Sequence, residues 1–79
     1  MRRRRQDPAD PESVAALATV DAYARAQQVL ADLGSPHAAQ QLRSAAWTRR
    51  EISEGDLGPI MRLRLDELAS RTREIAGPS

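Results

Sequence analysis

The sequence has no cysteine, lysine, asparagine or phenylalanine, and it has one tryptophan, one tyrosine and one histidine among 79 residues. Without cysteine, the chain cannot form disulfides, thiol nucleophiles or thiolate metal sites. The absence of lysine beside abundant arginine and alanine indicates the codon usage of a GC-rich bacterial gene. The preference for arginine over lysine is therefore no evidence of function by itself.

Groups for catalysis or for metal and phosphate binding are also scarce. The lone His37 lies in the first turn of a predicted helix and has no second histidine to pair with, and the serines lack a G-x-S-x-G context. The Glu-x-x-His spacing of bundle di-iron sites is absent, and Gly55 and Gly58 lack the following lysine of a phosphate loop. We expect no enzyme activity, no cofactor and no metal site.

Large apolar side chains are few for a chain of this length. Fourteen of the apolar residues are alanine, which leaves 18 larger ones for the core. A chain this short buries only about 60% of its unfolded surface, so small domains commonly need disulfides, metals or association for stability. With the first two excluded, the composition favours a single domain stabilised by association.

Positive charge is concentrated at the N-terminus. Four of the twelve basic residues are Arg2, Arg3, Arg4 and Arg5, so the rest of the chain holds eight basic and eleven acidic residues, a net charge of −3. Residues 1–10 show no apolar periodicity and are predicted to be a disordered arm. Four arginines can neutralise phosphates, which gives an alternative function as a small nucleic-acid-binding regulator. The acidic body opposes that alternative.

The apolar run from Val14 to Val20 is the only segment that resembles part of a secretion signal. Asp10, Glu12 and Asp21 lie in and around it, which argues against export. No run approaches the 18 uncharged apolar residues that a membrane span requires. We therefore expect a cytoplasmic protein that does not contact membranes.

Helix start and stop signals divide the rest of the chain into three segments. Asp10 is placed to cap the first helix with its side chain, Gly34 to end it, and Ser35 to cap the second. No alternation typical of strands occurs. The sequence predicts an all-α, three-helix antiparallel hairpin bundle with helices at about 11–33, 36–54 and 57–76 within a domain of residues 11–76, followed by a tail at 77–79.

The apolar faces of these helices exceed what three short helices can cover. Trp47 points away from the apolar side of the second helix, with Arg43 and Arg50 near it, and Ile60 and Leu63 lie off the apolar stripe of the third. Two copies can bury this surface in a larger bundle with two-fold symmetry. We expect a homodimer or higher assembly that acts as a small regulatory or accessory protein through contacts with another protein. The predicted partner-binding residues are Trp47, Arg43, Arg50, Ile60 and Leu63.

Overall fold

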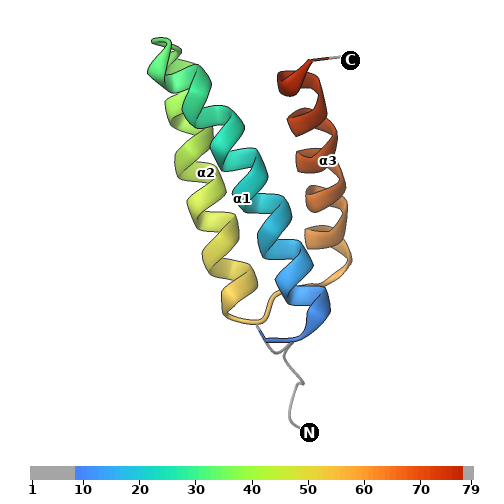
Figure 1. The fold of residues 1–79 in the computed structure, drawn as a ribbon. Helices are drawn as coiled ribbons and strands as arrows, with labels where there is room; N and C mark the ends of the chain where they lie inside the picture. The colour runs from blue at the N-terminus through green and yellow to red at the C-terminus, as the bar shows by residue number, and fades with distance from the viewer. Residues whose placement is uncertain (1–8, 78–79) are drawn as a thin grey trace, which may run out of the picture.

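The computed structural model describes residues 9–77, which form three α-helices and no strand. The helices are α1 (Pro11–Asp32), α2 (Pro36–Ser53) and α3 (Pro59–Ala76). α1 and α2 form an antiparallel hairpin, and α3 then runs in the same direction as α1 (Figure 1). The prediction of an all-α three-helix bundle is confirmed.

The turn between α1 and α2 follows the predicted capping pattern. Gly34 ends α1 with a φ of 96°, a left-handed conformation that side chains with a Cβ rarely adopt. The Ser35 hydroxyl accepts a hydrogen bond of 3.2 Å from the amide of Ala38, and Pro36 occupies the first position of α2. The short turn therefore reverses the chain and sets α2 directly against α1.

The other two helix starts differ from the sequence prediction. Asp10 occupies the N-cap position of α1, but its side chain makes no capping hydrogen bond, so that prediction is wrong. The start of α1 instead has Pro11 in its first turn and a backbone hydrogen bond of 2.9 Å from Val14 to the Asp10 carbonyl. α3 begins at Pro59 with Gly58 as its N-cap. The Asp56 carboxylate accepts a hydrogen bond of 3.3 Å from the Gly58 amide within the preceding loop.

α1 is the central helix of the bundle. It packs against both α2 and α3, whereas no pair of Cα atoms from α2 and α3 lies within 8 Å among the described residues. The buried positions of α1 recur at intervals of three and four residues, which is the spacing of a single helix seam. The buried apolar side chains are Ala16, Val20, Tyr23, Ala38, Ala45, Ile52, Leu57, Met61 and Leu68.

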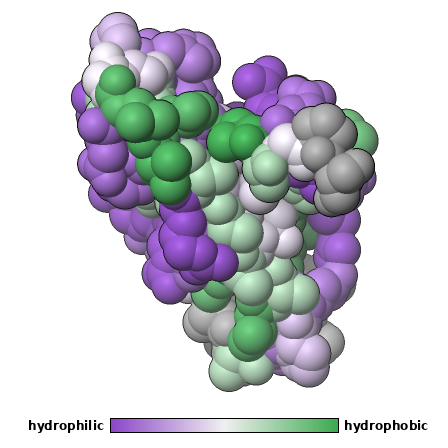
Figure 2. Space-filling view, turned by 45° about the horizontal axis from the view of Figure 1, so that its top comes forward, coloured by the Kyte–Doolittle hydropathy of each residue, from purple (hydrophilic) through white to green (hydrophobic). Residues whose placement is uncertain are grey.

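The end of the α1–α2 hairpin diverges from the C-terminal end of α3 (Figure 1). Figure 2 shows hydrophobic atoms gathered at that end, beside a notch that separates it from α3. Val29 and Leu33, which lie there, are 59% and 79% exposed. Leu33 belongs by periodicity to the apolar face of α1, but α3 does not cover this end of the hairpin.

Among the three described helices, none combines the length and the apolar character needed to cross a lipid bilayer.

Candidate functional site: the face formed by α2 and α3

Half of the exposed large apolar side chains belong to α2 and α3. Trp47 on α2 is 49% exposed, and Ile60 and Leu63 on α3 are 83% and 70% exposed. Nothing within the described part of the chain shelters these two aliphatic side chains. The other exposed large apolar residues of the described range are Val14 and Val29 of α1 and Leu33 at the C-cap of that helix.

Trp47 lies on the side of α2 that is turned away from the core. The core side carries Ala45 and Ile52, both of which are buried. Arg43 and Arg50 stand one turn before and one turn after Trp47, and both are exposed. An exposed indole between two guanidinium groups has the composition of an interface anchor, because Trp and Arg are enriched where binding energy is concentrated.

Arg64 joins α3 to α2 and fixes the level at which the two helices face each other. Its Nε donates to the Thr48 hydroxyl at 2.8 Å, and its Nη2 donates to the Ser44 hydroxyl at 2.5 Å. Thr48 is fully buried and donates in turn to the Ser44 carbonyl, at 3.0 Å. This bridge spans the space that the backbones of α2 and α3 leave between them.

The bridge places Trp47 and Leu63 at one level of the molecule, with Ile60 one helical turn away on α3. Trp47 precedes Thr48 in the chain, and Leu63 precedes Arg64. Ile60 lies four residues before Arg64 and so shares its side of α3. We call the surface formed by Trp47, Glu51, Ile60, Leu63 and Arg64 the α2–α3 face.

Glu51 belongs to this face by helix periodicity. It follows Ser44 by seven residues and Trp47 by four, so the three side chains share one side of α2. The α2–α3 face therefore presents apolar groups together with one cation and one anion.

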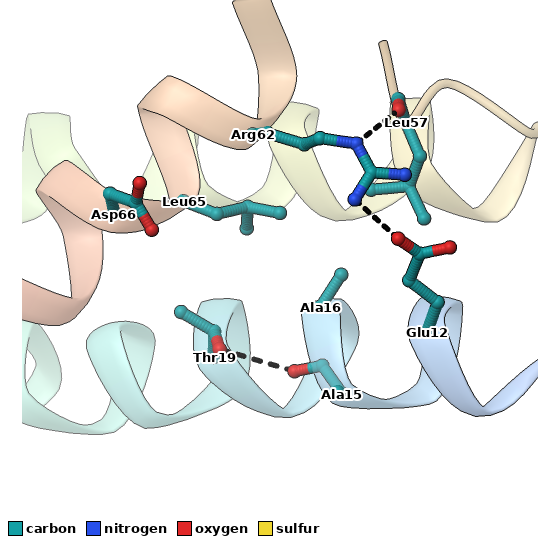
Figure 3. Close-up of a pocket in the computed structure, with 8 residues that line it drawn as sticks. All are labelled: Glu12, Ala15, Ala16, Thr19, Leu57, Arg62, Leu65 and Asp66. Carbon is teal, nitrogen blue, oxygen red and sulfur yellow. Dashed lines mark hydrogen bonds and ion pairs between the residues drawn. The ribbon is translucent and has the colours of Figure 1, made fainter. Parts of the chain in front are cut away.

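A small pocket lies on the other side of the molecule, between α1 and α3 (Figure 3). Its volume is about 250 Å³, below the roughly 300–1,000 Å³ typical of ligand sites. Arg62 bridges its mouth by donating to the Glu12 carboxylate through Nη1 and to the Leu57 carbonyl through Nε, the latter at 3.1 Å. The hydrogen bond from Arg62 and the charge of its guanidinium hold the pKa of Glu12 below its ordinary value.

Two of the three charged residues that line this pocket, Glu12 and Arg62, are paired with each other, and Asp66 is the third. Glu12 in turn raises the pKa of Arg62, so both groups are stabilised in their charged forms by each other. An anionic ligand that entered would have to displace this ion pair to contact Arg62. The pocket is therefore a weaker candidate than the α2–α3 face.

Within residues 9–77, the other residues that could take part in catalysis or metal binding form no second cluster. His37 is exposed at the start of α2. No group of three or more His, Asp or Glu residues within the described range is placed to hold a metal ion. Arg2, Arg3, Arg4 and Arg5, the predicted phosphate-binding arm, lie outside the described residues.

Two polar arrangements were not predicted from the sequence. One is the Arg64 bridge, and the other is a chain of hydrogen bonds in which Gln27 donates to the Tyr23 hydroxyl and that hydroxyl donates to Gln41. The available signal was the position of Gln27 four residues after Tyr23, on the buried seam of α1. Arg64 gave a similar signal, since it adjoins the apolar stripe of α3.

Comparisons with protein-family models, with curated proteins and with solved structures found no match to this chain.

Proposed function

We propose that this protein is a non-enzymatic protein–protein interaction module, a small regulatory or accessory protein that acts as a helical homodimer through its α2–α3 face. The observation that carries the proposal is the exposure of Trp47, Ile60 and Leu63 on α2 and α3 beside the Arg64 bridge. Burying an aromatic or a large aliphatic side chain contributes roughly 1.5–3 kcal/mol. Three such groups supply a central apolar contact for association.

A second copy is the occupant that this face fits best. Under two-fold symmetry, α2 of one copy meets α3 of the other, so Trp47 packs against Ile60 and Leu63 of the second copy, and the reverse contact forms as well. Arg43 and Arg50 then lie at the rim beside the indole, where guanidinium groups stack on aromatic rings. The resulting assembly is a larger bundle in which Trp47, Ile60 and Leu63 of each copy are covered.

The proposal is tested by measuring the mass of the protein in solution. Sedimentation equilibrium at about 100 μM is expected to give a dimer or a larger species, since protein–protein interfaces of standard size have dissociation constants well below that value. Trp47→Asp and Leu63→Asp each place a charge in the contact and should produce monomers, because a buried unpaired charge is costly.

Val29→Asp is the matched control, because Val29 is exposed to a similar degree but lies on α1. This variant should keep the mass of the wild-type protein. A wild-type monomer at 100 μM would overturn the proposal. Loss of the dimer in the Val29 variant alone would show that α1, and not the α2–α3 face, forms the interface.

A further inference from the structure

The guanidinium of Arg64 uses only one of its edges within the chain. Nε and Nη2 are both directed at α2, to Thr48 and Ser44. The guanidinium has five N–H donors in a fixed fork, so the remaining three stay available for an acceptor. Among the residues that the structure describes, none accepts a hydrogen bond from Nη1 of Arg64.

The acceptors that Arg64 does use are neutral. Both are hydroxyl groups, and none of the ion pairs between described residues includes Arg64. Arg64 is half-buried by its own chain, and covering the α2–α3 face would remove more water from it. A cation that loses water at an interface needs an anion, because desolvation without a counter-charge is strongly unfavourable.

Glu51 is an anion of the same face that has no side-chain partner among residues 9–77. It is half-buried, and its carboxylate has no hydrogen bond or ion pair with a residue that the structure describes. Glu67, an exposed acid on that side of α3, is already paired, with its Oε1 3.8 Å from Nε of Arg71. Glu51 is therefore a carboxylate of the α2–α3 face that remains available to Arg64.

Two-fold symmetry turns these two groups into a reciprocal pair. In such an interface, if residue i of one copy contacts residue j of the other, then j of the first copy contacts i of the second. If the two-fold axis runs between α2 and α3, then α2 of one copy faces α3 of the other. Arg64 of each copy is thereby brought towards Glu51 of the second copy. The same arrangement places Trp47 of one copy against Ile60 and Leu63 of the other.

From this complementarity, and resting on the proposed homodimer, we infer that Arg64 of each copy binds the Glu51 carboxylate of the other through the free end of its guanidinium. The hydroxyls of Ser44 and Thr48 hold the guanidinium in place for this contact, so little side-chain freedom is lost on binding. The pair selects a second copy of this chain, because a surface without a carboxylate at that position would leave Arg64 buried and uncompensated.

Charge reversal in a mixing experiment tests the pair. Glu51→Arg puts two cations at each contact, and Arg64→Glu puts two anions there. Each variant alone should dimerise at least about tenfold more weakly than the wild-type protein, since like charges replace a charge-assisted hydrogen bond. An equimolar mixture of the two variants places opposite charges at both contacts and should recover dimer mass. Arg25→Glu on α1, an exposed position, is the control for charge reversal and should leave the mass unchanged.

The outcomes separate this pair from the dimer itself. A monomeric wild-type protein overturns the proposed function and the pair together. A wild-type dimer that both variants leave intact overturns only the pair, and so does a mixture that stays monomeric, since Arg64 would then act within its own chain. Circular dichroism shows whether Arg64→Glu keeps its helices. If it does not, Glu51→Gln in the presence of native Arg64 replaces it, and an unchanged dissociation constant for that variant overturns the pair.

Discussion

The hydroxyl of Tyr23 on α1 donates a hydrogen bond of 2.9 Å to Oε1 of Gln41 on α2. The same hydroxyl accepts from Nε2 of Gln27, also at 2.9 Å, and both Tyr23 and Gln27 are buried. Three polar side chains therefore form a continuous chain of hydrogen bonds across the contact between the two helices of the hairpin. Oε1 of Gln27 is buried and has no partner within residues 9–77, so the hydrogen-bonding groups of Gln27 are only partly satisfied.

Removing the Tyr23 hydroxyl should destabilise the hairpin. Tyr23→Phe keeps the ring in the core but leaves the amide of Gln27 without an acceptor and Gln41 without a donor. Leaving a buried polar group unpaired costs about 1–3 kcal/mol, so we expect the free energy of unfolding to fall by that amount. Urea denaturation followed by circular dichroism measures the change.

The double variant Tyr23→Phe/Gln27→Leu is the control for this interpretation. It removes the unpaired Gln27 amide together with the Tyr23 hydroxyl. Replacing both partners of a hydrogen bond by apolar groups has little effect on the free energy of unfolding. It should therefore be more stable than Tyr23→Phe alone. A double variant that is less stable would show that the loss comes from packing rather than from the unpaired amide.

Ser13 is a second position where the buried seam of α1 holds a polar atom. It is fully buried, and its hydroxyl has no hydrogen-bond partner among the residues that the structure describes. Ser13→Ala removes that hydroxyl and improves helix propensity by about 0.5 kcal/mol, so the variant should be as stable as the wild-type protein or more stable. A measured loss of more than about 1 kcal/mol in urea denaturation would mean that the hydroxyl has a partner in solution.

The ion pair of Glu12 with Arg62 should make the stability of the α1–α3 contact depend on pH. Because the pair lowers the pKa of Glu12 in the folded chain, the unfolded chain binds more protons in the acidic range, and stability rises with pH there. The stabilisation is present above the ordinary carboxyl range, about pH 4.3, and is lost as the pH falls below it. Glu12→Gln should therefore unfold at lower urea concentration than the wild-type protein at pH 7 and at a similar concentration at pH 2.

Salt provides an independent check on that effect. Both side chains of the pair are 50% exposed, so 1 M NaCl should screen most of the attraction and reduce the difference at pH 7. A difference between the two proteins that is the same at pH 7 and at pH 2 would rule out the ion pair as its cause.

The sequence predicts the helices well because the local signals act within a few residues. Gly34 and Ser35 determine the first turn through backbone conformation and a side-chain cap, both of which are independent of the rest of the chain. On α3, Met61, Leu65, Leu68, Thr72 and Ile75 recur at intervals of three and four residues and are all buried or half-buried, since periodicity alone defines a helix face.

The candidate site is less predictable, because it depends on how the helices sit relative to one another. Trp47, Ile60 and Leu63 were identified from their positions on isolated helices, but nothing in those positions places Trp47 and Leu63 at one level. That relation comes from the contact of Arg64 with Ser44 and Thr48, which joins residues 16 and 20 positions apart in the chain. Helix periodicity carries no information on such contacts.

The single tryptophan makes the proposed dimer visible in fluorescence. Trp47 is 49% exposed in one copy, and the chain has no other indole, so its emission reports on this face alone. Covering the indole with Ile60 and Leu63 of a second copy transfers it to an apolar environment, which shifts its emission maximum to shorter wavelength.

We expect the maximum of the wild-type protein to move to longer wavelength on dilution, with a midpoint that matches the dissociation constant from sedimentation. Leu63→Asp should show the long-wavelength maximum at every concentration, whereas Val29→Asp should follow the wild-type curve. An emission maximum that is independent of concentration, in a protein that sedimentation shows to dissociate over the same range, would place Trp47 outside the interface.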